Sequence, residues 1–296
     1  QSYISHPFSR FQRIDFGLTW HNINYDILDR VINTFGQEEL IKRPGASSKF
    51  TTILPTMSWV IDNSVFGVTG PIDGYRQNAS VTASPGWKND FKFQTMKVDA
   101  RKYWRIGRDY TIALRGFFGS SQGKNAQKFF LGGTPYLLTD FQSGTTNGVS
   151  DPSSYRSVIA DTSNSNLITD VYFTEYAFPM RGARFAERIG THAALFNFEV
   201  RFPFINYLAL GFPLKLVLGN IRGHAFMDIG AAWDNNNEFS NNSWPAKYGS
   251  NNPGNFSPWI VTSGLGAKIN LGYFLLRIET AWDKNPGGYS KPQWYL

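Results

Sequence analysis

Cysteine is absent from the 296 residues, and charged residues make up only 17% of them. Without cysteine the chain forms no disulfide, no thiolate metal site and no cysteine nucleophile. Soluble domains usually carry about 25% charged residues, so charge is scarce as well. Aromatic residues reach 16%, and with abundant Gly, Asn, Ser and Thr this composition is typical of a barrel with lipid outside and polar groups inside.

Long apolar runs are also missing, because no stretch approaches the ~18–20 apolar residues that a transmembrane helix requires. A membrane protein with this sequence is therefore a β-barrel, since only helices and closed barrels satisfy their backbone polar groups in lipid. Residues 1–6 lack the basic and apolar regions of a signal peptide. We expect either that a signal peptide has been removed or that the sequence is an internal fragment.

The formal net charge of +7 suits either nucleic acid or a lipid surface as a partner. The basic residues are scattered rather than clustered, which argues against a nucleic-acid surface. Anionic lipid phosphates attract the same charge. We therefore expect a lipid surface as a partner, and no nucleic acid.

Apolar and polar residues alternate with a period of two along most of the chain, which is the pattern of a strand with one apolar face. Phe196 and Phe198, for example, fall on one face, whereas Asn197 and Glu199 fall on the other. The segments with this pattern are 11–21, 52–60, 75–83, 91–104, 110–118, 193–204, 225–233, 259–269 and 274–283. They predict about ten strands and little helix, apart from one or two helical turns in residues 35–42.

A soluble β-sandwich also shows such alternation, but two features favour a membrane barrel. Polar faces carry opposite charges beside one another, as in Lys97, Asp99 and Arg101. Tryptophans concentrate near the segment ends, as in the aromatic girdles of outer-membrane barrels; they are Trp20, Trp59, Trp104, Trp233 and Trp282. We therefore predict an all-β fold, a transmembrane antiparallel β-barrel.

The longest tract without a strand pattern runs from about residue 119 to residue 191. Its middle is rich in Ser, Thr, Asn, Asp and Gly, and loops of this length are usually functional or disordered. We predict a large extracellular loop that returns to the lumen. Strands of the same chemistry resume after it, so we predict one domain over residues 1–296.

Five motifs follow one another in a fixed order: residues 129–133 (FFLGG), 178–182 (FPMRG), 197–203 (NFEVRFP), 223–233 (GHAFMDIGAAW) and 263–266 (SGLG). This series resembles the C-terminal barrel, or bacterial surface antigen domain, of the outer-membrane protein assembly-factor superfamily. Its members include BamA-type insertases, TamA-type translocation factors and two-partner-secretion transporters. The resemblance implies a sixteen-stranded barrel, of which this chain holds about ten C-terminal strands. The resemblance further implies upstream strands and periplasmic modules, usually POTRA repeats, which we expect outside this sequence.

In this family an Arg-Gly loop tip folds into the lumen, and the resemblance assigns that role to Arg181 and Gly182. Glu199 and Asp228 would then be the carboxylate partners of Arg181. The residue pattern agrees, because both acids lie on polar strand faces and carboxylates hold a guanidinium as a planar fork. Glycine would permit a tight turn or a close approach to the wall. We expect a structural latch rather than a catalytic dyad.

One position departs from the family pattern, because Ala183 stands where an aromatic residue is usual. This departure puts the anchoring contact of that aromatic in doubt, and Phe185 is the candidate substitute.

Four charged residues are predicted to form a charge network on the lumen wall: Asp99, Arg101, Arg277 and Glu279. Of the four histidines, His192 and His224 are expected at strand ends rather than as ligands. The sequence has no paired-histidine metal motif, no nucleophile elbow and no phosphate-binding loop. We therefore predict no metal site, no cofactor and no enzymatic activity.

Two functions remain open. The first is a bacterial outer-membrane barrel that inserts β-barrel proteins or passes polypeptide across the membrane, with unfolded outer-membrane or secreted polypeptide as its substrate. Outer-membrane lipid and lipopolysaccharide, and periplasmic modules or accessory subunits, would be its further partners. The second is a passive structural barrel or pore that anchors a periplasmic or surface partner.

Overall fold

The computed structural model describes residues 1–32, 38–86, 92–133, 174–177, 179–183, 187–211, 216–239, 258–271, 274–285, 288–289 and 292–295. The described strands are β1 (Ser2–Ser9), β2 (Gln12–Ile32), β3 (Glu38–Asp62), β4 (Val65–Gly67), β5 (Gly70–Pro85), β6 (Lys92–Ile106), β7 (Tyr110–Gln122), β8 (Phe129–Leu131), β9 (Glu175–Ala177), β10 (Arg188–Gly190), β11 (His192–Leu210), β12 (Leu216–Trp233), β13 (Trp259–Asn270), β14 (Leu275–Asn285), β15 (Gly288–Tyr289) and β16 (Gln293–Tyr295). One 3-10 helix, η1, spans Asn236–Phe239. Among these residues no helix is long and apolar enough to cross a membrane.

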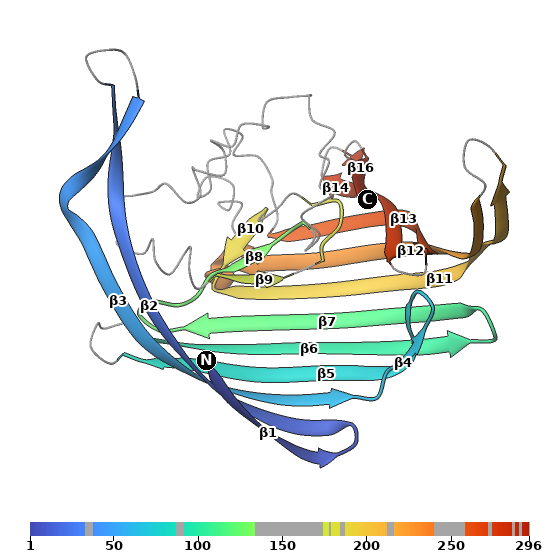
Figure 1. The fold of residues 1–296 in the computed structure, drawn as a ribbon, viewed down its shortest axis with the longest axis horizontal. Helices are drawn as coiled ribbons and strands as arrows, with labels where there is room; N and C mark the ends of the chain where they lie inside the picture. The colour runs from blue at the N-terminus through green and yellow to red at the C-terminus, as the bar shows by residue number, and fades with distance from the viewer. Residues whose placement is uncertain are drawn as a thin grey trace.

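Ten of the described strands, each of eight residues or more, lie side by side in one antiparallel sheet (Figure 1). Their order is β1-β2-β3-β5-β6-β7-β11-β12-β13-β14, with β16 paired to β14 and β4 to β5. The predicted all-β antiparallel fold is confirmed. Within the described part of the chain the order does not lead back to β1, so one edge of the sheet lies at β1 and the other beside β14.

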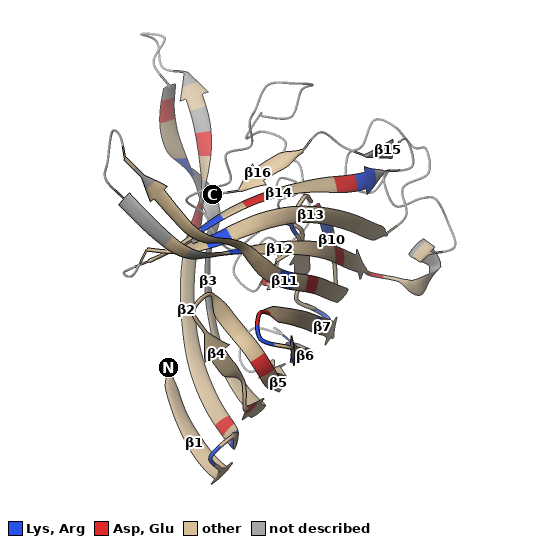
Figure 2. Ribbon diagram, turned by 90° about the vertical axis from the view of Figure 1, so that its right-hand side faces the viewer, with Lys and Arg blue, Asp and Glu red and all other residues tan. Residues whose placement is uncertain are grey.

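The two faces of the sheet differ as the alternation predicts. On β11, the side chain of Phe196 is 41% exposed, whereas Asn197 and Glu199 on the opposite face are buried. The same division holds on β12, where Met227 is exposed and Asp228 is fully buried. Figure 2 shows few blue or red segments in a mostly tan ribbon, so charged residues are sparse along the described strands.

Consecutive antiparallel strands reverse direction, so their connections alternate between the two ends of the sheet. One end, here called the long-loop end, carries the connection between β7 and β11. The other, here called the short-turn end, carries the turns between β1 and β2 and between β6 and β7. The β2–β3 and β11–β12 hairpins project beyond their neighbours at opposite ends (Figure 1).

The tract between residues 119 and 191 contains strands that the sequence pattern did not predict. β7 continues to Gln122, and β8, β9 and β10 form a small separate sheet. Each of these three strands has three residues, which is too short to show a period. Packing stabilises them instead, because Phe129 and Leu131 are fully buried in a cluster with residues of β11 and β12. Residues 134–173, the middle of the predicted loop, lie outside the described residues.

The predicted helical turns in residues 35–42 are wrong where the structure describes them. Residues 38–42 belong to β3 and pair with residues 28–32 of β2. Cross-strand pairing therefore overrides the local helix preference of this Glu-containing segment, because helix propensity is only a weak prior.

Candidate functional site

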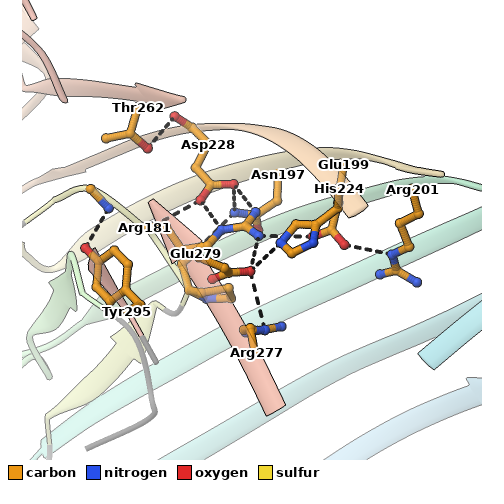
Figure 3. Close-up of polar contacts among 12 residues, drawn as sticks. Arg181, Asn197, Glu199, Arg201, His224, Asp228, Thr262, Arg277, Glu279 and Tyr295 are labelled. Atoms are coloured by element: carbon orange, nitrogen blue, oxygen red, sulfur yellow. Dashed lines mark hydrogen bonds and ion pairs between the residues drawn. The ribbon is translucent and has the colours of Figure 1, made fainter. Parts of the chain in front are cut away.

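The Arg-Gly segment lies on the inner face of the sheet, where Arg181 is held by Asp228 (Figure 3). An isolated bridge between Gly133 and Met180 fixes the approach of the segment. Arg181 then donates from Nε to Asp228 Oδ2 at 2.9 Å and from Nη2 to Oδ1 at 2.8 Å. Its backbone N–H also donates to Oδ2, at 3.1 Å. This is the bidentate fork that gives an arginine–carboxylate pair its geometric specificity.

Two further carboxylates contact the same guanidinium from other strands. Arg181 Nη1 donates to Glu199 Oε2 on β11 at 3.0 Å and to Glu279 Oε1 on β14 at 3.4 Å. The side chains of Arg181, Asp228 and Glu279 are 3% exposed or less, and that of Glu199 is 10% exposed. One loop residue therefore connects strands β11, β12 and β14. The sequence placed Glu279 in a separate network and did not predict this contact.

An aromatic ring and an amide complete the contacts of the loop tip. The guanidinium carbon of Arg181 lies 3.5 Å from the ring centroid of Phe226, a cation–π contact. Asn197 Nδ2 donates to Asp228 Oδ1 at 2.8 Å and to the backbone oxygen of Pro179 at 2.9 Å. Asn197 thus orients the carboxylate and holds the loop backbone at once.

Gly182 meets two requirements that exclude other residues. Its φ is +85°, a left-handed conformation that costs a side-chain-bearing residue free energy. A Cβ atom at this position would lie 3.1 Å from Ala281 Cβ and 3.3 Å from Thr262 Cβ. The backbone of the loop tip therefore lies against β13 and β14, and only glycine fits without displacement.

The last described strand contacts the same tip. The backbone N–H of Gly182 donates to Tyr295 Oη at 2.7 Å, and Tyr295 Oη donates to Gln293 Oε1 at 2.8 Å. Tyr295 is 5% exposed and packs with Phe226 and Ala281. The tip is thus enclosed between the wall and β16.

The small residue Ala183 is buried at 2% exposure, in one cluster with Met180 and Leu195. A small side chain fits this tightly packed place. Phe185, the predicted substitute for the missing aromatic, lies outside the described residues.

His224 lies in the middle of β12 rather than at a strand end, so that prediction is wrong. It is 1% exposed, and its Nε2 lies 2.6 Å from Glu279 Oε1. His224 lies four residues before Asp228, so the period of two places both side chains on the inner face. The sequence holds no other signal of this placement. His192 does begin a strand, β11.

Basic residues surround the three carboxylates. Lys268 Nζ donates to Glu199 Oε1 at 2.8 Å, and Arg201 Nε donates to the same oxygen at 2.7 Å. Arg277 lies 3.4 Å from Glu279. Strand patterning places such residues on the inner face, but it does not reveal which inner residues meet across strands.

The other part of the predicted charge network lies elsewhere on the wall. Asp99 accepts hydrogen bonds from Arg101 on its own strand, at 2.9 Å, and from Arg115 on β7, at 2.7 Å. Of the four predicted network residues, Asp99 and Arg101 thus form one cluster, and Arg277 and Glu279 join the Arg181 site.

The charges around the loop tip favour a permanently charged Arg181. Burial opposes the charge of Arg181, but the Asp228, Glu199 and Glu279 carboxylates outweigh burial and raise the pKa of Arg181 above its usual range. Each of the three carboxylates accepts a hydrogen bond from a cation. Within the described ranges, no group of three or more His, Asp and Glu side chains is placed to hold a metal ion. The arrangement is suited to holding a loop against a wall.

An antiparallel sheet with an apolar outer face and charged inner positions is the pattern of a transmembrane β-barrel wall. A family model, the Omp85 superfamily domain, matches residues 1–296. The chain belongs to the Omp85 superfamily, and its location is the bacterial outer membrane.

A solved structure shares the fold. It is BamA from Haemophilus ducreyi lacking POTRA domains 1-3, with a TM-score of 0.56 and 12% sequence identity. The similarity covers 99% of this chain and 52% of that chain, so this chain spans about half the length of the BamA chain it matches. A comparison with curated proteins found no match.

Proposed function

We propose that this chain is the C-terminal part of an outer-membrane barrel that inserts β-barrel proteins or passes polypeptide across the bacterial outer membrane. Membership of the Omp85 superfamily and the fold shared with BamA support this role. The long-loop end would face the outside, and the short-turn end would face the periplasm. Unfolded outer-membrane or secreted polypeptide would be the substrate, and periplasmic modules or accessory subunits would assist.

The observation that carries the proposal is the burial of Arg181 among carboxylates of three strands. A loop pinned in this way narrows the lumen while it stays latched, and its release would open a path. Because removal of one partner leaves buried charges uncompensated, the latched state is strongly favoured over a half-released one.

The edge of the sheet beside β14 supports the assembly role over a passive one. In the described part of the chain, β16 pairs with β14 through three residue pairs, from Glu279–Tyr295 to Ala281–Gln293. The β14 edge would then offer its backbone to an incoming strand by β-augmentation.

The role of the latch is tested by planar-bilayer conductance of the wild-type protein and the Arg181→Ala variant. We expect the variant to open more often and to a higher mean conductance, because the loop no longer blocks the lumen. Arg101→Ala, which removes a wall arginine that does not contact the loop tip, is the matched control. An Arg181→Ala trace identical to the wild-type trace would refute the latch.

Assembly is separated from the passive-barrel alternative by reconstitution. Proteoliposomes with the protein are supplied with a urea-unfolded eight-stranded outer-membrane protein, and its folding is followed by heat-modifiable gel mobility. We expect faster folding than in protein-free liposomes. Equal rates would favour the passive barrel. We propose no enzymatic activity and no cofactor for this chain.

A further inference from the structure

Residues 63–71, which comprise the β3–β5 connection with β4 and the first two residues of β5, cross the inner face of the sheet at the short-turn end. We call this segment the strap. In Figure 1 the strap and β4 rise from β5 in front of β6 and β7 and reach β11. Arg201 Nη1 on β11 donates to the backbone oxygen of Pro71 at 2.5 Å. Asn270 Nδ2 on β13 donates to the backbone oxygen of Val68 at 3.3 Å. The strap thus bridges strands that are not neighbours in the sheet.

The strap is a built structure rather than a loose loop. At its base, Ser64 Oγ donates to Asp62 Oδ1 at 2.5 Å, and the backbone N–H of Tyr75 donates to Asn63 Oδ1 at 2.7 Å. Gly74 has a φ of +90°, and a Cβ there would collide with the backbone of Asn63. These hydrogen bonds and the backbone conformation of Gly74 fix the direction in which the strap crosses the inner face.

One carboxylate connects the strap to the loop tip. Glu199 accepts from Arg181 on Oε2 at 3.0 Å and from Arg201 on Oε1 at 2.7 Å. Arg201 contacts the strap through Nη1, which donates to Pro71. The guanidinium of Arg201 also lies 5.9 Å from the ring of Tyr103, and its side chain is 15% exposed. A continuous line of hydrogen bonds therefore runs from the long-loop side of the lumen to the short-turn side.

We propose that Arg201 is a positioning residue that couples the Arg181 latch to the strap through Glu199. The fork of Arg201 serves both partners at once, because its planar donors point to Glu199 and to Pro71. When Arg181 leaves Glu199, Oε2 loses this donor, and the carboxylate is held at Oε1 by Lys268 and Arg201. It can then shift toward these two cations, so the position of Arg201 changes. The strap then loses an anchor, so the two barriers across the lumen open together.

The coupling deepens the proposed function and rests on it, because a second barrier matters only if polypeptide passes. The strap carries the exposed apolar side chains Val65, Phe66 and Val68, at 54%, 64% and 61% exposure. If the strap swings away, these side chains leave the short-turn end of the lumen, where the proposed substrate would enter.

The test uses pulsed electron paramagnetic resonance on the purified protein in detergent, without substrate. Nitroxide labels are attached to cysteines introduced at Val68 in the strap and at Arg108 in the β6–β7 turn; this chain has no cysteine of its own. We expect one narrow distance in the parent protein. Arg201→Ala should replace it by a broad distribution, and Arg201→Lys should do the same, because a lysine ammonium does not reach both partners as a fork does.

The decisive variants are Arg181→Ala and Glu199→Gln, neither of which changes a residue that touches the strap. We expect both to broaden the Val68–Arg108 distance, and the double variant Arg181→Ala/Arg201→Ala to be no broader than Arg201→Ala. Lys128→Ala is the matched control, because it breaks an ion pair to Asp234 at the long-loop end and should keep the narrow distance.

An unchanged distance in Arg181→Ala and Glu199→Gln would overturn the coupling, and an unchanged distance in Arg201→Ala would overturn the anchoring of the strap. The measurement involves no transport, so a failed coupling is distinguishable from a failed proposed function, which the conductance and folding assays address.

Discussion

Two charge clusters lie on the inner wall, and they differ in what they join. The Arg181 cluster connects a loop to three strands, and its guanidinium side chain is 3% exposed. The Asp99 cluster connects two neighbouring strands that the sheet already pairs, and its Arg101 side chain is 37% exposed. The same residue types therefore have different consequences. A buried pair that joins distant segments controls a conformation, whereas a pair between adjacent strands adds little to the backbone hydrogen bonds that already join them.

The largest expected effect comes from Arg181→Ala. Three buried carboxylates lose a shared cation, and breaking a buried pair from one side costs about 3–5 kcal/mol. We expect urea-induced unfolding in detergent, followed by heat-modifiable gel mobility, to shift to lower urea by a corresponding amount. Arg101→Ala is the control, and equal shifts in the two variants would erase the difference between the clusters.

Gly182→Ala should have the next largest effect. The left-handed backbone costs a residue with a side chain about 1–3 kcal/mol, and the new methyl group also crowds Ala281 and Thr262. We expect lower stability in the same urea assay. Gly116→Ala is the matched control, because a Cβ at Gly116 would meet nothing within 4 Å. If both alanine variants behave alike, the tip does not need glycine.

Tyr295→Phe removes only the hydroxyl that accepts from Gly182. A buried N–H left without a partner costs about 1–2 kcal/mol. We expect the tip to loosen while β16 keeps its packing, which faster hydrogen exchange of the 179–183 segment would reveal. Trp294→Phe, at an exposed neighbouring position, should leave that exchange unchanged. Faster exchange in both variants would mean that β16, and not the hydroxyl, protects the segment.

The smallest effect is expected for Asp99→Asn. Asparagine keeps a side-chain oxygen that still accepts a hydrogen bond from an arginine, the two strands stay joined by their own backbone hydrogen bonds, and Arg115 stays near the ring of Phe117. The urea midpoint should barely move. A loss as large as that of Arg181→Ala would mean that the Asp99 cluster also carries a long-range role.

The alternation along the strands was sufficient to place Glu199 and Asp228 on the inner face, because every second residue of a strand points to the same face. The alternation does not give strand register, so the sequence could not reveal that Glu279 meets Arg181 across the sheet. Tyr295 was missed for a related reason. Its partner Gly182 lies far away in the sequence, and no local pattern links the two residues.

The fold itself was predictable where strands were long and regular. β1 was missed because Pro7 and His6 interrupt the alternation of Ser2–Ser9, and its place is set by pairing with β2. β8, β9 and β10 are held by tertiary packing, so three-residue segments gave no signal. The strap was likewise unpredictable. It contacts Arg201 and Asn270 through backbone oxygens, which every residue type has, so no residue pattern indicates these contacts.

The most direct test of the latch is trypsin cleavage of the Arg181–Gly182 bond, followed by mass spectrometry. Trypsin must bind the arginine side chain, which Asp228 and Glu199 bury in the latched state. We expect no cleavage at this bond in the wild-type protein or in Asp99→Asn, and rapid cleavage in Asp228→Asn. Cleavage of the wild-type bond as fast as that in Asp228→Asn would contradict a latched Arg181.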